Sequence, residues 1–162
     1  MKFPFVLILA GSLVLTAPLA FAAGSGSDNG GSSGGTTTTK VDPDYAAGRK
    51  ASDAKDWARA IPLLQKAVAT DPKNANAYNL LGYSLRHVGK IDAALDSYDK
   101  ALAINPKHKG AHEYIGEAYL QMGNVGKAEE HLKALDRICF FGCEEFTELK
   151  EKIAAFKAKT KG

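Results

Sequence analysis

The sequence repeats with a period of 34 residues from residue 41 onward. Five unlike columns keep this spacing, and they include small, large apolar and proline positions. The columns are Gly48, Gly82 and Gly116; Ala60, Ala94 and Ala128; Leu64, Tyr98 and Leu132; Pro72 and Pro106; and Gly89 and Gly123. A fixed period of about 20 to 50 residues is typical of solenoids, in which each unit buries its apolar face against its neighbours.

The middle unit indicates the secondary structure of each period. Its first apolar face, spaced i, i+3, i+4 and i+7, consists of Tyr78, Leu81, Gly82 and Leu85. Gly89 then breaks the chain, and Pro106 ends a second helix because proline cannot continue one. The inner face of that second helix consists of Ile91, Ala94, Leu95, Tyr98 and Leu102. We therefore expect a helical hairpin, with Gly82 allowing the second helix to approach the first.

The middle unit resembles the tetratricopeptide repeat. Its Tyr78-x2-Leu81-Gly82-x2-Leu85, Ala94-x3-Tyr98 and Pro106 are similar to the family pattern W-x2-L-G-x2-Y, A-x3-F and P. The resemblance covers three units, 41–74, 75–108 and 109–142, and the outer two depart from the pattern at Asp44, Ala51, Lys55, His112 and Phe140. It implies an all-α fold, a right-handed solenoid of three antiparallel helix hairpins.

One more amphipathic helix is predicted at residues 144–158. Its apolar face consists of Phe146, Leu149, Ile153 and Phe156. Glu144 and Glu145 begin it and Lys157 and Lys159 end it, an order that complements the helix dipole. We expect this helix to cap the last hairpin, so that the repeat domain extends over 41–160.

Two segments before the repeats are not expected to join the fold. Residues 1–22 have a positive start at Lys2, an apolar run and the sequence Ala20-Phe21-Ala22, as in a secretory signal peptide cut after Ala22. Residues 23–40 are rich in Gly, Ser and Thr and bury too little apolar surface to fold, so they predict a flexible linker, either a plain leader or a tether.

The apolar stretch could instead remain as a membrane anchor, because residues 3–23 carry no charge. Pro18 and the lack of any Lys or Arg between Lys2 and Lys40 favour cleavage. We expect an exported protein, periplasmic or secreted. A short repeat protein with such a leader resembles bacterial exported tetratricopeptide proteins.

Cys139 and Cys143 are the two cysteines of the chain, and they flank a turn that contains Gly142. In an oxidising compartment they are expected to form a disulfide that fixes the capping helix. The alternatives are reduced thiols, or a redox or metal site. However, CxxxC differs from the CxxC of thioredoxin-like enzymes, and zinc would need two more ligands. His131, the nearest histidine, is expected to point elsewhere.

Composition and motifs do not indicate an enzyme or a nucleic-acid-binding protein. The formal net charge is +3, and most Lys and Arg are interspersed with Asp and Glu. We find no phosphate-binding loop, nucleophile elbow or metal-binding His pair with a helical Glu. His108 and His112 are four apart, but His108 precedes its helix. We predict no catalytic residue, cofactor or metal.

The resemblance implies a concave groove, lined by the first helix of each hairpin, that holds a peptide. Helical geometry gives as candidates Tyr45, Arg49, Asp53, Asn76, Asn79, Tyr83, Arg86, His87, Glu113, Glu117 and Leu120. The arginines favour an acidic ligand and the glutamates a basic one, which predicts a groove graded from positive to negative. The alternative is that these residues are only the polar face of each helix.

We therefore expect a non-enzymatic protein- or peptide-binding adaptor or assembly factor. Two alternatives remain open at this point. One is a thiol-redox or metal-handling protein that uses Cys139 and Cys143. The other is a membrane-tethered scaffold that has the same groove but keeps its N-terminal segment.

Overall fold

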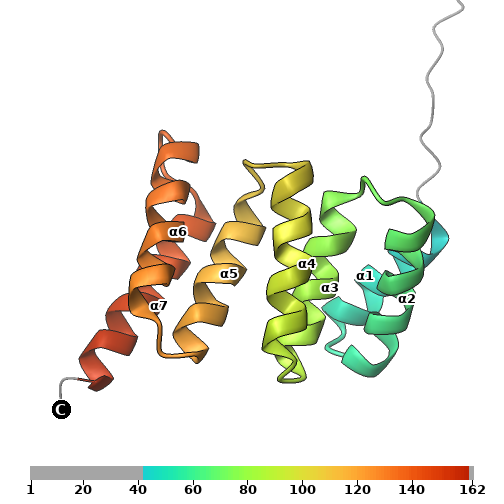
Figure 1. Cartoon of the computed structure of the whole chain (residues 1–162), viewed down its shortest axis with the longest axis horizontal. Coiled ribbons are helices and arrows are strands. Elements are labelled where there is room, and N and C mark those ends of the chain that lie inside the picture. Colours follow the sequence, from blue (N-terminus) through green and yellow to red (C-terminus); the bar gives the residue numbers. More distant parts are fainter. Residues whose placement is uncertain (1–41, 161–162) are drawn as a thin grey trace, which may run out of the picture. The chain divides into compact units, whose positions relative to one another are not determined.

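The computed structural model describes residues 42–160, which form helices joined by short turns (Figure 1). The helices are α1 (Pro43–Asp53), α2 (Trp57–Thr70), α3 (Ala75–His87), α4 (Ile91–Ile104), α5 (Lys109–Gln121), α6 (Val125–Ile138) and α7 (Glu144–Thr160). This arrangement confirms the all-α solenoid. None of these helices is long and apolar enough to cross a membrane. The predicted signal peptide (1–22) and linker (23–40) lie outside the described residues.

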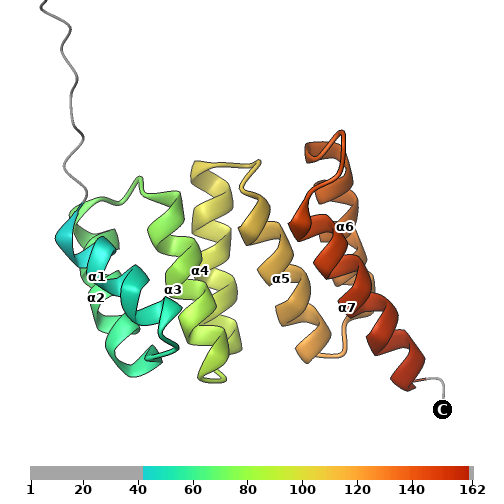
Figure 2. The same cartoon turned by 180° about the vertical axis from the view of Figure 1, so that it is seen from behind.

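Successive helices pair as hairpins, and the hairpins stack side by side (Figure 2). α1 pairs with α2, α3 with α4 and α5 with α6, while α7 packs against both helices of the third hairpin. In addition, α1 contacts α3, α3 contacts α5 and α5 contacts α7, whereas α2, α4 and α6 do not contact one another. Because the odd-numbered helices lie closer together, the stack of residues 42–160 curves toward them, and they line its concave side.

The helix ends follow from local side-chain chemistry. Five helices begin at a side chain that accepts a hydrogen bond from the backbone N–H three residues on; these caps are Asp42, Asp56, Asn74, His108 and Asn124. Between the helices of a hairpin, Gly89 and Gly123 have φ of 78° and 75°, and Lys55 takes the same left-handed conformation at 58°. A residue with a Cβ atom costs about 1–2 kcal/mol there, so the first turn is the most strained of the three.

Glycine marks the closest helix approaches. A Cβ atom on Gly82 would lie 2.5 Å from Cε1 of Tyr98, and one on Gly48 would lie 2.7 Å from Cγ of Leu64. Both contacts are within one hairpin, as the period predicts. In the third unit, however, a Cβ on Gly116 would lie 2.6 Å from Cδ2 of Leu149, which belongs to α7. The capping helix therefore fills the notch at Gly116.

The buried side chains form two apolar clusters. The first is shared by α1 to α5 and surrounds Leu64, Tyr98 and Ile115. The second joins the third hairpin to α7 and consists of Leu120, Ala128, Leu135, Leu149 and Ile153. The capping role predicted for the last helix is thus confirmed. The same contacts show that Leu120 was wrongly placed in the groove, because it is only 7% exposed and packs in the second cluster.

Cys139 and Cys143 form a disulfide between α6 and α7, with their Cα atoms 5.7 Å apart. Closing so short a loop stabilises the fold by about 2 kcal/mol in the chain-entropy account. The bond ties the start of α7 to the end of α6. Between the cysteines, Phe140 and Phe141 are 87% and 97% exposed.

The histidines of the third unit make structural contacts. His108 caps α5 through Nδ1 and bonds the Oδ1 of Asn76 through Nε2, at 2.9 Å. His112 Nε2 lies 3.1 Å from the carbonyl oxygen of Pro106, so this nitrogen carries the proton. In neutral His112 the other nitrogen then accepts a hydrogen bond from Nδ1 of His131, at 3.0 Å. His131 is thus engaged with His112, while the two cysteines bond one another.

We predict that Gly82→Ala destabilises the fold by about 1–3 kcal/mol, because its Cβ would overlap the ring of Tyr98. Gly126→Ala is the matched control, since a Cβ at this helical position meets nothing closer than 3.8 Å. Alanine there should not destabilise α6, because Gly126 lies in its first turn and alanine is the better helix former. Denaturant unfolding measures both changes, and equal effects of the two substitutions would contradict the close approach.

Candidate peptide-binding groove

A pocket of about 560 Å³ lies on the concave side of the stack, between α3, α5 and α7. It is lined by Tyr83, Arg86 and His87 of α3; Gly110, Glu113, Tyr114 and Glu117 of α5; and Glu144, Glu145, Glu148 and Lys152 of α7. Five of these are residues that the sequence placed in the groove: Tyr83, Arg86, His87, Glu113 and Glu117. The pocket is therefore the part of the predicted groove that the fold assembles into one site.

The other predicted groove residues lie outside this pocket. Tyr45 packs against the first apolar cluster, while Arg49 and Asp53 are exposed on α1. Asn76 is held by His108, and Asn79 is buried with its Oδ1 atom lacking a hydrogen-bond partner. These five predicted groove residues lie on α1 and α3, but they do not line the pocket.

Aromatic rings form one wall of the pocket. The ring centroids of Tyr83 and Tyr114 are 4.8 Å apart, and those of Tyr83 and His87 are 4.5 Å apart. His87 in turn stacks on Trp57, the first residue of α2, at 4.4 Å with the planes within 5°. The row of rings thus joins α2, α3 and α5, and it offers flat apolar surface beside the charged side chains.

Arg86 crosses from α3 to α5 beneath these rings. Its Nη2 atom lies 2.6 Å from Oε2 of Glu117, and the two side chains are only 6% and 13% exposed. The guanidinium carbon is 5.6 Å from the ring centroid of Tyr83 and 5.7 Å from that of Tyr114. Because Arg86 and Glu117 pair directly, the predicted gradient from positive to negative along the groove does not hold for them.

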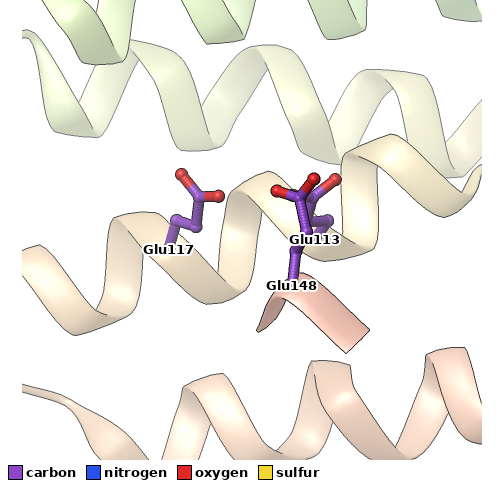
Figure 3. Close-up of side chains that lie close together, drawn as sticks. All are labelled: Glu113, Glu117 and Glu148. Atoms are coloured by element: carbon purple, nitrogen blue, oxygen red, sulfur yellow. The ribbon is translucent and has the colours of Figure 1, made fainter. Parts of the chain in front are cut away.

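Three glutamates meet on the α7 side of the pocket (Figure 3). Glu113 and Glu117 come from α5 and Glu148 from α7, and one carboxylate oxygen of each lies within 4.8 Å of the others. Such a set of oxygens is able to bind a cation. The Lys152 ammonium of α7 takes that position: it donates to Glu148 at 2.8 Å, to Glu113 at 3.3 Å and to Glu117.

The charges of this cluster do not balance. Three carboxylates face two cations, Arg86 and Lys152, so one negative charge is in excess. Burial raises the pKa of Glu113 to about 8, with the Lys152 ammonium opposing the shift and the Glu117 carboxylate adding to it. Burial disfavours the charged form of Lys152, but its hydrogen bonds to Glu117 and Glu148 prevail and raise its pKa. The proton that Glu113 keeps near neutral pH therefore removes this excess negative charge.

Sequence reasoning missed the contribution of α7 to this site. It treated the last helix as a cover for the apolar core, whereas Glu145, Glu148 and Lys152 line the pocket. Their spacing of i, i+3 and i+7 already places them on one helical face, and that face was the available signal. Trp57 was also missed, although it is the one tryptophan of the chain.

Comparison with known sequences defines the class of protein. Sequence models of the tetratricopeptide repeat match residues 45–109 and 85–138, so that together they cover more than half of the chain. The protein therefore belongs to the tetratricopeptide repeat family. A search of curated proteins found no match.

Solved structures with similar folds include MamA and a secretion chaperone. MamA AMB-1 has 30% sequence identity and a TM-score of 0.55, over 59% of this chain and 56% of that one. MamA MSR-1 has 29% identity and a TM-score of 0.53, over 67% of this chain and 56% of that one. The present chain thus matches little more than half the length of these two MamA structures.

The *Yersinia enterocolitica* type III secretion translocator chaperone SycD has 20% identity and a TM-score of 0.66, over 74% of this chain and 84% of that one. At this level of identity the likeness shows the fold alone. It agrees with the helical stack described above.

We predict that Glu113→Gln makes the protein more stable than the parent at about pH 9, by at least about 1 kcal/mol, and leaves the two alike near pH 5. The folded state holds a proton on Glu113 up to about pH 8, whereas the unfolded carboxyl releases it near its ordinary value of 4.5. This group therefore makes the parent lose stability as the pH rises through that window. Thermal unfolding at several pH values measures the slope, and an unchanged slope in the variant would contradict the assignment.

Proposed function

We propose that this protein is a non-enzymatic adaptor or assembly factor that binds a segment of a partner protein in the pocket between α3, α5 and α7. The observation that carries the proposal is the pocket itself, with its half-buried Tyr83 and Tyr114 and the exposed His87. Tyrosine and arginine are enriched where proteins bind one another, because they combine large contact area with polar groups. Membership of the tetratricopeptide repeat family supports protein binding.

The pocket suits a few side chains of a peptide. Its volume of about 560 Å³ falls in the range of about 300–1,000 Å³ that is common for ligand sites. Its titratable groups bond one another, as in the contacts of Arg86 with Glu117 and of Lys152 with Glu148. This arrangement favours recognition of a partner over chemistry on a substrate.

A photo-crosslinking amino acid at position 87 tests this function. His87 is exposed and lines the pocket, whereas Asp96 is exposed on α4 and is a matched control outside it. We expect a defined protein to be crosslinked from position 87 and not from position 96, and to bind the purified protein directly. The same products from both positions, or products from position 96 alone, would place the contact elsewhere.

The proposed place of action is an exported compartment, the periplasm or the medium. It is supported by the signal-peptide pattern of residues 1–22 and is compatible with the disulfide between Cys139 and Cys143. We expect the exported protein to begin at Ala23, which intact-mass spectrometry of the periplasmic fraction measures. A mass that includes residues 1–22 in the membrane fraction would favour the tethered scaffold instead.

A further inference from the structure

We propose that the α7 side of the groove binds a lysine or arginine side chain of the partner, and that Lys152 is an internal stand-in for that cation. The inference rests on the proposed function, because it specifies the chemistry of the segment that the groove binds. The partner's cation would take the position among Glu113, Glu117 and Glu148 that the Lys152 ammonium now holds.

The charge of the pocket differs in sign from that of the chain. The chain has a formal net charge of +3, whereas the pocket is lined by five glutamates and two cations. Glu145 is paired with Lys109 at 3.5 Å, and among the described residues Glu144 has no ion-pair partner. The net charge would attract an acidic partner, so a preference for basic segments would have to come from the pocket.

Lys152 shows that the three carboxylates can hold an ammonium group. The ammonium has three donor hydrogens, and it contacts one carboxyl oxygen of each of Glu113, Glu117 and Glu148. Hydrogen bonds between charged groups are about twice as strong as neutral ones, and a partner's lysine would make the same set. A guanidinium could contact the same oxygens with paired donors.

Lys152 can also be displaced. Its side chain is 42% exposed, whereas those of Glu113 and Glu117 are 6% and 13% exposed, so the glutamates form the floor and the lysine covers it from the solvent side. A flexible lysine stem can turn outward and regain hydration of its ammonium. Arg86 cannot replace it, because it is held at Glu117 from the α3 side.

The tyrosines complete the subsite. Tyr83 and Tyr114 line the same pocket as the three glutamates, and the guanidinium carbon of Arg86 already lies 5.6 and 5.7 Å from their ring centroids, to one side of the pair. An arriving aliphatic stem can contact their apolar faces while its charged end reaches the carboxylates. An acidic side chain would instead face the carboxylates of Glu117 and Glu148.

Capped heptapeptides Asn-Ala-Ala-X-Ala-Ala-Asn, with X as lysine, norleucine or glutamate, test the inference by nuclear magnetic resonance titration of the full exported protein. Norleucine keeps the apolar stem of lysine and removes its charge. We expect the lysine peptide to bind at least about fivefold more tightly than the norleucine peptide and to shift the signals of α5 and α7. The glutamate peptide should bind most weakly.

Two variants with matched controls locate the contact. Glu148→Gln should weaken binding of the lysine peptide about fivefold, and Lys152→Met should strengthen it by a similar factor because the position becomes vacant. Glu151→Gln and Lys159→Met change the same charges at exposed positions of α7 outside the pocket, and they should leave binding unchanged. All four positions are on the surface or half-exposed, so the fold is expected to be retained.

Equal affinities for the lysine and norleucine peptides, or weaker lysine binding after Lys152→Met, would overturn the inference. If the norleucine peptide shifts the pocket signals as strongly as the lysine peptide, the groove still binds peptides and only the cation preference is wrong. If none of the peptides shifts them, the cation position adds no measurable affinity and the inference again fails. The proposed function is judged separately, by the crosslink from position 87.

Discussion

The contact between Leu149 and Gly116 fixes how α7 docks on the third hairpin. A hairpin stack ends with an apolar face that must be covered, and α7 covers it by placing Leu149 where Gly116 has no side chain. The same contact sets the rotation of α7. Because Glu148 precedes Leu149 and Lys152 follows one turn later, docking the apolar face turns the charged face toward α5. Core packing and the charged wall of the groove therefore depend on a single helix position.

The ion pairs of the groove differ in how costly they are to disturb. Arg86 and Glu117 are both largely buried, and removing one partner of such a pair leaves an uncompensated charge at a cost of about 3–5 kcal/mol. Lys152 and Glu148 are more exposed, so they can exchange partners with smaller loss. The two sides of the pocket therefore differ in kind: the α3 side is fixed by its buried pair, and the α7 side is able to adapt to a ligand.

Much of the fold could be predicted because the residues that recur every 34 positions are those at which the helices pack closely. Gly48 and Gly82 recur where a neighbouring side chain occupies the space of a Cβ atom, and Lys55 marks the turn that lacks glycine. The period could not show that Gly116 faces α7, because the capping helix has no column in the repeat. For the same reason Leu120 was assigned to the groove. The equivalent positions of the two earlier units hold the polar residues Ser52 and Arg86, whereas Leu120 packs with apolar side chains of α6 and α7.

The candidate site was predicted only in part, for a related reason. Helical geometry identifies which side chains of α3 and α5 point inward, and three of the residues it assigned to the groove, Tyr83, Arg86 and Glu117, line the pocket. It does not show which charges pair across helices, since that depends on side-chain distances. The ion pair of Arg86 with Glu117 and the cluster around Lys152 could therefore be seen only in the structure.

The docking of α7 also limits how this protein can evolve in length. Repeat proteins commonly grow by duplicating whole hairpins, because each unit contacts only its neighbours. Here a hairpin inserted before α7 would separate Glu148 and Lys152 from Glu113 and Glu117, while a hairpin removed from the N-terminal end would leave them together. Lineages that keep this cluster of charges should accordingly vary in the number of repeats ahead of α3 and preserve the junction between α5 and the last helix.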